Sequence, residues 1–340
     1  MTPMDLSCLE KILEGEPKYR LKQAKEAVFR RLINDWSEAS NLSAPLREKL
    51  NQTCPLQVRG EIVESASNAE TLKAIITLQD GLKIEGVLMR HKNKRNTVCV
   101  SSQVGCPLGC RFCATGAMGF RRDLSASEIV DQVLFFARFL QKRGEQKITN
   151  VVFMGMGEPF LNYDNVVAAI KILNDKDGLS IGARKISVST SGVIEGIKKL
   201  ANEKFQVNLA ISLHAPDDDL RSQLMPINRK YPLKEVLRAV DDYIRKTSRQ
   251  VMFEYILLKG INDSEEDAKK LARLMRRSLY FVNLIAYNVV DGKNMEPSSA
   301  QAIKKFKNIL EKAGVVVSER YRFGRDIKAA CGQLATPSGF

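Results

Sequence analysis

Length, composition and charge set the first limits on this protein. The chain has 340 residues, of which 44% are hydrophobic, so it can bury a sizeable core and is not disordered as its main state. It contains no run of 18 apolar residues and no signal peptide, so we expect a cytoplasmic protein with no membrane partner. Lys and Arg outnumber Asp and Glu by 53 to 39, and this net charge of +14 favours a nucleic-acid partner.

The first predicted domain, residues 1–90, is a small α+β module. Residues 21–32 have apolar positions at helical spacing, whereas residues 56–63 and 74–78 alternate as strands do. The polar, basic run KNKRN at 92–96 predicts the joint to the second domain, residues 91–340.

The second domain repeats a strand followed by a helix. Strands are predicted at 97–101, 150–154, 185–189, 206–213, 251–257 and 281–286. Helices are predicted at 126–142, 165–173, 193–200, 233–246, 265–276 and 299–313. Six such pairs indicate an α/β protein with a parallel sheet, either doubly wound or a full or partial (β/α) barrel. In both architectures ligands bind at the C-terminal ends of the strands.

Three of the seven cysteines form a C-x3-C-x2-C loop directly after the first of these strands, namely Cys106, Cys110 and Cys113. Three thiolates leave one corner of a four-iron cluster without a protein ligand. The alternatives are a zinc site, which needs a fourth ligand, and unligated thiols. The odd, unevenly spaced set of cysteines argues against a disulfide scaffold. We therefore interpret Cys8 and Cys54 as ordinary small residues.

Seven collinear motifs between about residues 85 and 335 carry a more specific signal. They are CVSSQVGC at 99–106, FCATG at 112–116, MGMGEP at 154–159, STSG at 189–192, SLHAP at 212–216, MPIN at 225–228 and AACGQL at 329–334. Together they resemble the radical S-adenosylmethionine (SAM) family of ribosomal RNA adenine-C2 methyltransferases. The resemblance implies a partial (β/α)6 radical SAM barrel with a small N-terminal α+β accessory domain that binds RNA.

The resemblance also implies the cofactors and their ligands. A [4Fe-4S] cluster would be held by Cys106, Cys110 and Cys113, and SAM would chelate the open iron. The implied SAM contacts are Gly157, Glu158, Ser189, Ser212, Leu213, His214 and Asn288. Two SAM molecules would be used per turnover, and an electron donor such as flavodoxin would reduce the cluster.

The implied reaction is methylation of C2 of adenine 2503 in 23S ribosomal RNA, with transfer RNA as a second substrate in some family members. Cys331 would accept a methyl group from one SAM, and a radical from a second SAM would activate that methyl group to add to C2. Cys99 would act in removing the C2 proton and form a disulfide with Cys331 as the RNA leaves. Glu85 resembles a second acid–base residue.

Three other functions compete with this interpretation. Related resistance enzymes methylate C8 of the same adenine; Pro159 and Ala215 favour C2, whereas residues 221–225 and 247–251 resemble the C8 type. A non-catalytic RNA-binding iron–sulfur protein would need neither Cys99 nor Cys331. A radical enzyme acting on a peptide would leave the context of Cys331 unexplained.

The net charge leaves open which basic residues contact RNA. The target base must leave its stack to be modified, and phosphate contacts would supply most of the affinity. The candidates are Lys18, Arg20, Lys22, Lys25, Lys92, Lys94, Arg95, Arg121, Arg122, Arg273, Arg276 and Arg277. We expect a monomer.

Overall fold

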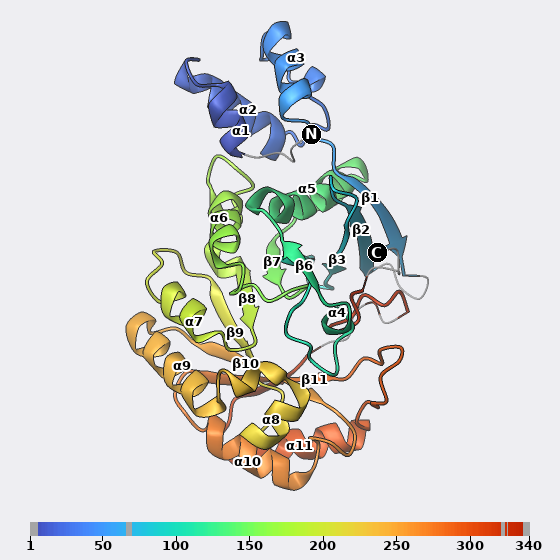
Figure 1. Cartoon of the computed structure of the whole chain (residues 1–340), viewed down its shortest axis with the longest axis vertical. Coiled ribbons are helices and arrows are strands. Elements are labelled where there is room, and N and C mark those ends of the chain that lie inside the picture. Colours follow the sequence, from blue (N-terminus) through green and yellow to red (C-terminus); the bar gives the residue numbers. More distant parts are fainter. Residues whose placement is uncertain (1–5, 66–69, 321–323, 325, 336–340) are drawn as a thin grey trace.

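Three N-terminal helices form one end of the molecule's long axis (Figure 1). The structure is a computed structural model that describes residues 6–65, 70–320, 324 and 326–335. The helices are α1 (Leu6–Ile12), α2 (Lys18–Phe29) and α3 (Ala44–Thr53), with a short 3-10 turn at Trp36–Glu38. Trp36 is fully buried between them and donates its indole N–H to the Cys54 carbonyl at 2.7 Å. We call residues 6–54 the helical module.

A disulfide joins Cys8 on α1 to Cys54 at the end of α3. The prediction that these two are ordinary small residues is therefore wrong. The bonded cysteines are 46 residues apart, and the packing of α1 against α3 brings them together. Spacing along the chain gave no sign of this pairing, because it depends on a helix–helix contact.

Ten strands in the rest of the described chain form one sheet. Its first four strands are antiparallel neighbours: β1 (Arg59–Glu64), β2 (Thr71–Thr77), β3 (Lys83–Arg90) and β4 (Asn96–Val100). The parallel part continues from β4 through β7 (Asn150–Phe153), β8 (Ile186–Thr190), β9 (Asn208–Ser212), β10 (Val251–Leu257), β11 (Tyr280–Ala286) and β12 (Val317–Glu319). The boundary expected near residue 90 falls between β3 and β4, which are hydrogen-bonded to each other.

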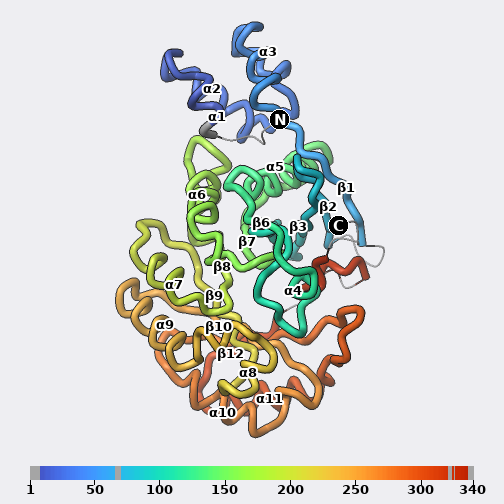
Figure 2. The backbone as a smooth tube through the Cα atoms, in the orientation of Figure 1, coloured from blue at the N-terminus to red at the C-terminus, as the bar shows by residue number. Residues whose placement is uncertain are grey.

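The order of the parallel strands in the sheet follows their order in the chain. A doubly wound sheet reverses its order at a switch point, whereas a barrel adds each strand to the same edge. The predicted α/β class and partial barrel are confirmed. The outer helices are α5 (Ala126–Lys142), α6 (Tyr163–Asn174), α7 (Ile194–Leu200), α9 (Leu233–Thr247), α10 (Glu265–Met275) and α11 (Ala300–Lys312). The backbone tube in Figure 2 shows their order along the chain. Among the described residues, no helix is long and apolar enough to span a bilayer.

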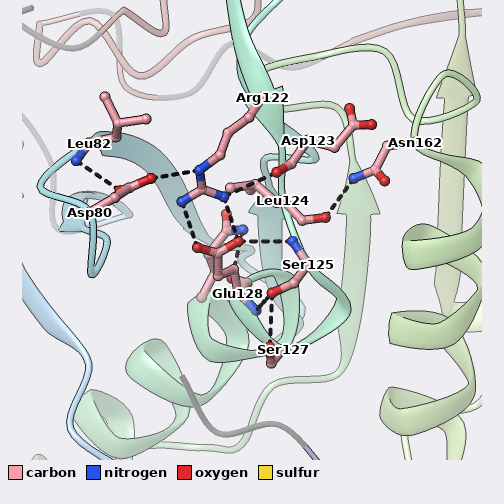
Figure 3. A network of polar contacts seen from close by, with 10 residues as sticks. Asp80, Leu82, Arg122, Asp123, Leu124, Ser125, Ser127, Glu128 and Asn162 are labelled. Carbon is pink, nitrogen blue, oxygen red and sulfur yellow. Dashed lines mark hydrogen bonds and ion pairs between the residues drawn. The ribbon is translucent and has the colours of Figure 1, made fainter. Parts of the chain in front are cut away.

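A small hairpin, β5 (Gln103–Gly105) and β6 (Phe120–Asp123), encloses the cysteine loop and the short helix α4 (Ala114–Ala117). Arg122 fastens this hairpin to the barrel (Figure 3). Its guanidinium donates to both oxygens of Glu128 on α5, at 2.8 and 2.9 Å, and to Asp80 at 2.7 Å. Glu128 also caps the start of α5 together with Ser125. The cysteine loop is therefore held on a rigid base.

Candidate active site

The cysteine loop follows β4 and lies at the C-terminal ends of the parallel strands. The backbone N–H of Cys106 donates to the Gly119 carbonyl at 2.8 Å, and that of Arg111 donates to Leu224 at 2.9 Å. Cys110 and Cys113 pack against a separate apolar cluster that includes Phe112, Ala215, Leu224, Met225, Ile256 and Tyr287. The loop therefore presents partly buried thiols beside an apolar surface.

The three thiols lie close enough to influence one another electrostatically. Burial raises the pKa of Cys106 to about 12, and the nearby Glu158 and Cys113 add to this effect. Burial raises the pKa of Cys110 well above its usual range, and Cys113 and Cys106 raise it further. A bound cation would reverse this balance, because metals bind the thiolate form.

A four-iron cluster fits this donor set. Each thiolate of such a cluster binds a different iron, so the sulfurs need not converge on a single point. Within the described ranges, no three Cys, His, Asp or Glu side chains are arranged to hold one metal ion.

The serines predicted to contact SAM lie together at the ends of β8 and β9. The hydroxyl oxygens of Ser189 and Ser212 are 3.3 Å apart. Ser189 also donates to Glu254 on β10 at 3.2 Å. These three side chains therefore form a polar row across neighbouring strand ends.

Glu158 is buried, and its carboxylate accepts hydrogen bonds from the neighbouring backbone. Its carboxylate accepts from the N–H of Phe160 at 3.0 Å and from that of Ser191 at 2.8 Å. Burial raises the pKa of Glu158, while these hydrogen bonds act in the opposite direction. Gly157 has φ +98°, and a Cβ there would lie 2.6 Å from Cβ of Gln103. The close approach that requires a glycine is therefore made to Gln103.

His214 and Asn288 differ in whether the described chain provides hydrogen-bond partners for their side chains. His214 Nδ1 accepts from the Ile256 N–H at 3.1 Å, its ring meets Phe112 edge-on at 5.0 Å, and burial lowers its pKa to about 3. It is a neutral side chain that supports the cysteine loop. Asn288 donates to the Cys331 carbonyl at 3.3 Å, but its buried Oδ1 has no partner in the described chain. An unpartnered buried amide oxygen suits a bound ligand with a donor, such as the ammonium of SAM.

The structure brings Cys99 and Cys331 to one cavity. This thiol cavity has a volume of about 40 Å³ and is lined by Val87, Met89, Cys99, Met154, Ile285, Ala286, Asn288, Arg320, Ala329, Ala330, Cys331 and Leu334. Cys99 faces it from β4, opposite Val87 of β3 and Val152 of β7. Burial raises the pKa of Cys99 to about 12, and Cys331 raises it further.

Arg320, which follows β12, lines the same cavity and was not predicted from the sequence. It pairs with Glu254 at 2.8 Å and lies 3.4 Å from the Met154 sulfur. The charge of Cys331 raises the pKa of Arg320, and Glu254 and Cys99 add to this effect. Through Glu254, Arg320 thus links the polar row of Ser189, Ser212 and Glu254 to the thiol cavity. No motif marked it, because a single arginine outside a pattern carries no signal.

Glu85 lies beside the segment that carries Cys331 rather than at the thiols. It is fully buried on β3, pairs with Lys73 of β2 at 3.0 Å and accepts from the Ala335 N–H at 3.0 Å. Burial raises the pKa of Glu85, and the Lys73 charge opposes this. The same segment is also bound to α4, because Ala114 donates to the Gly332 carbonyl at 2.8 Å and Thr115 to Leu334 at 2.6 Å.

Several of the basic candidates for RNA contact are occupied within the fold. Lys25 pairs with Asp175 at 3.2 Å, Arg122 is held in the hairpin network, and Arg277 pairs with Asp241. The exposed candidates include Lys18, Lys22, Lys92, Lys94, Arg121, Arg273 and Arg276.

Comparison with known proteins decides the family. The model of the radical SAM superfamily matches residues 100–272. A probable dual-specificity RNA methyltransferase RlmN from Dictyoglomus turgidum is 46% identical over 320 residues, 94% of this chain and 91% of that protein. The crystal structure of a radical SAM methyltransferase from Sphaerobacter thermophilus superposes with a TM-score of 0.93 at 45% identity, covering 97% of each chain. This chain belongs to the RlmN family.

Membership of the RlmN family makes the chain a radical SAM enzyme, and that superfamily implies a [4Fe-4S] cluster and SAM. The cysteine loop matches this expectation in position and in donor chemistry. The residues predicted for SAM lie on the strand ends next to it.

Proposed function

We propose that this chain methylates C2 of adenine 2503 in 23S ribosomal RNA, and C2 of an adenine in transfer RNA, through a methyl group carried on Cys331. The observation that carries the proposal is the thiol cavity, in which Cys99 and Cys331 meet beside the cysteine loop. A protein that only binds RNA would need neither thiol.

The chemistry explains why a carrier is needed. C2 of adenine is an electron-poor carbon and does not attack the methyl group of SAM directly. When bound, the cluster supplies one electron and SAM supplies the methyl group and a carbon radical, with two SAM molecules used per turnover. Cys331 holds the methyl group at the cavity and presents it to the base. Transfer of one hydrogen atom from this methyl group to the radical supplied by SAM would let its carbon bond to C2, so that a methylene group joins the sulfur of Cys331 to C2.

Cys99 then breaks that link in the proposed mechanism. It takes part in removing the proton from C2, and its sulfur then attacks the sulfur of Cys331. The bond between the Cys331 sulfur and the methylene carbon breaks, that carbon takes up a proton to become the new methyl group, and the one electron released as the disulfide forms would return to the cluster. Its position on β4 fixes it across the cavity from the C-terminal segment. Glu85 holds that segment through Ala335, so its proposed part in the reaction is to keep Cys331 in place.

The proposed RNA surface combines the helical module with the joint after β3. Lys18, Lys22, Lys92 and Lys94 are exposed there. If they contact phosphates, each Lys→Gln change should weaken binding of all RNA sequences alike and reduce the salt slope by about 1. We place the reaction in the cytoplasm, with a flavodoxin-like donor for the cluster.

The test is made without oxygen, with SAM, a reductant and unmethylated ribosomal RNA. The native protein should yield 2-methyladenosine by mass spectrometry, Cys331→Ala should yield none, and Cys99→Ala should trap a protein–RNA adduct. The double variant Cys8→Ala, Cys54→Ala is the matched control and should still form product. A product methylated at C8 would reject the C2 assignment, and no methylated base with SAM still cleaved would reject the substrate.

A further inference from the structure

Arg221 is a buried cation on the short helix α8 (Asp218–Leu224). Its side chain is 0% exposed, although arginine is almost never fully buried unless it is paired. Taking such a charge out of water is costly unless its donors and its charge are both satisfied. A fully buried arginine therefore needs an explanation.

The donors of Arg221 are satisfied by the ends of two strands. Nη2 donates to the carbonyl of Ser191, after β8, at 2.6 Å and to that of Ser212 on β9 at 3.1 Å. Nε donates to the Leu213 carbonyl at 3.1 Å. The planar fork of one guanidinium thus fixes the end of β8 against the end of β9. These are the segments that carry the proposed SAM contacts Ser189, Ser212 and Leu213.

Asn228, which follows α8, accepts from the remaining nitrogen of the guanidinium. Its Oδ1 accepts from Arg221 Nη1 at 2.7 Å. Its amide in turn donates to Asp218 Oδ1 at 2.9 Å and to the Ser222 hydroxyl at 2.8 Å. Arg221 is therefore locked in one orientation by a side chain from the MPIN motif.

The positive charge of Arg221 has no carboxylate partner among the described residues. No carboxylate in the described part of the chain forms an ion pair with it. Cys110 packs against the apolar cluster that includes Leu224, which lies one turn after Arg221 on the same helix. The helix of Arg221 also meets the cysteine loop through the hydrogen bond between Arg111 and Leu224.

We propose that Arg221 is a positioning residue with two functions: it sets the β8 and β9 ends that receive SAM, and it is the fixed counter-charge beside the Cys110 corner of the cluster. This inference rests on the proposed cluster and SAM site but not on the RNA reaction. Reduction adds one negative charge to a cluster, and a nearby buried cation stabilises the reduced form more than the oxidised form. Loss of the cation should therefore make the midpoint potential more negative.

Two variants separate the two functions. Arg221→Gln removes both the charge and the fork, whereas Arg221→Lys keeps a charge and removes the fork. Arg238→Gln, at an exposed position on α9, changes the net charge by the same amount and is the matched control. Each protein is reconstituted with iron and sulfide, and its iron content, midpoint potential and affinity for SAM are measured without RNA.

We expect Arg221→Gln to shift the midpoint potential to more negative values and to weaken SAM binding by about tenfold or more. Arg221→Lys should keep a potential close to that of the native protein and still lose SAM affinity. Arg238→Gln should change neither. Native potential and native SAM affinity in Arg221→Gln would overturn the proposal.

Failure of a variant to take up the cluster is also informative. Loading of Arg221→Lys but not of Arg221→Gln would support the counter-charge, whereas equal failure of both would overturn it. If the native protein itself bound no four-iron cluster, the proposed function would fail instead. If it bound the cluster and SAM but methylated no RNA, the inference about Arg221 would stand.

Discussion

The helical module and the thiol cavity each contain two cysteines that are distant in sequence, and the two pairs differ in state and surroundings. Cys8 and Cys54 are bonded to each other at the edge of three small helices. Cys99 and Cys331 are separate thiols on either side of a cavity that also contains the charge of Arg320. Neither pair could be assigned by counting residues. The surroundings distinguish a structural crosslink from a reactive pair, because a reactive thiol needs space for a substrate and a nearby charge.

The largest effect expected at the active-site end concerns Gly157. In Gly157→Ala the new methyl group would meet Gln103 at 2.6 Å in a backbone with φ +98°, so we expect a loss of about 3–5 kcal/mol in the free energy of unfolding. Gly81→Ala is the control, since Gly81 also has positive φ (+83°) but nothing lies within 4 Å; it should cost about 1 kcal/mol. Urea unfolding measures both, and equal losses would show that φ alone matters at Gly157.

The disulfide should contribute almost as much in the helical module. Cys8→Ser with Cys54→Ser is expected to lower the free energy of unfolding by about 3–4 kcal/mol, because the bond closes a long loop. Reduction of the native protein should have the same effect and should add nothing in the double variant. If the double variant also lost methyl transfer to Cys331, the functional separation of the two cysteine pairs would be wrong.

At the thiol cavity the charge of Arg320 can be tested by itself. Arg320→Met should slow the transfer of a labelled methyl group from SAM to Cys331 by about 10- to 100-fold, or roughly 1.4–2.7 kcal/mol, because a cation favours the thiolate. Arg245→Met, which removes an exposed arginine from a surface ion pair, is the control. Equal rates in the two variants would mean that Arg320 only supports packing.

The smallest effect, when it is counted per pH unit, concerns the junction between the helical module and the sheet, where Asp131 of α5 lines a cavity with Pro55 and Gln57. Burial raises the pKa of Asp131 to about 7 from an ordinary value of 3.8, with Arg138 opposing and Glu128 adding to the shift. The folded protein then binds more protons than the unfolded chain between these values. Stability should therefore fall as pH rises through this range, by roughly 1 kcal/mol per pH unit, and level off above pH 7.

Urea unfolding at pH 5, 6, 7 and 8 measures this slope. Asp131→Asn should flatten it, since the amide does not titrate. An unchanged slope in that variant would assign the pH dependence to other groups.

The parts of the fold that could be predicted from the sequence are those with a local pattern. The predicted helix at 126–142 and the predicted strand at 251–257 match α5 and β10 residue for residue. The apolar positions of α5 repeat with the helical period, and β10 is a short, nearly continuous apolar run. β3 was not predicted, because Glu85 and Gly86 interrupt its apolar residues and leave neither an alternation nor a continuous apolar run. β12 has three residues, too few for a period to show.

Those site residues that belong to a sequence motif could be predicted from the sequence. Ser189 and Ser212 lie at the ends of neighbouring strands and contact each other, because ligand sites in such barrels collect at one edge of the sheet. Arg320 and the contact from Glu85 to Ala335 were not predictable. They depend on how the C-terminal segment folds back over the antiparallel strands, and no local pattern encodes that path.

The hydrogen bond between Glu85 and Ala335 also bears on how freely the parts of this protein could have been exchanged during evolution. The helical module is joined to the sheet by a single crossing of the chain, so it could be replaced by another module. β2 and β3 could not, because Lys73 and Glu85 anchor the segment that carries Cys331. The unit inherited as a whole would therefore begin at β1 and not at the first parallel strand.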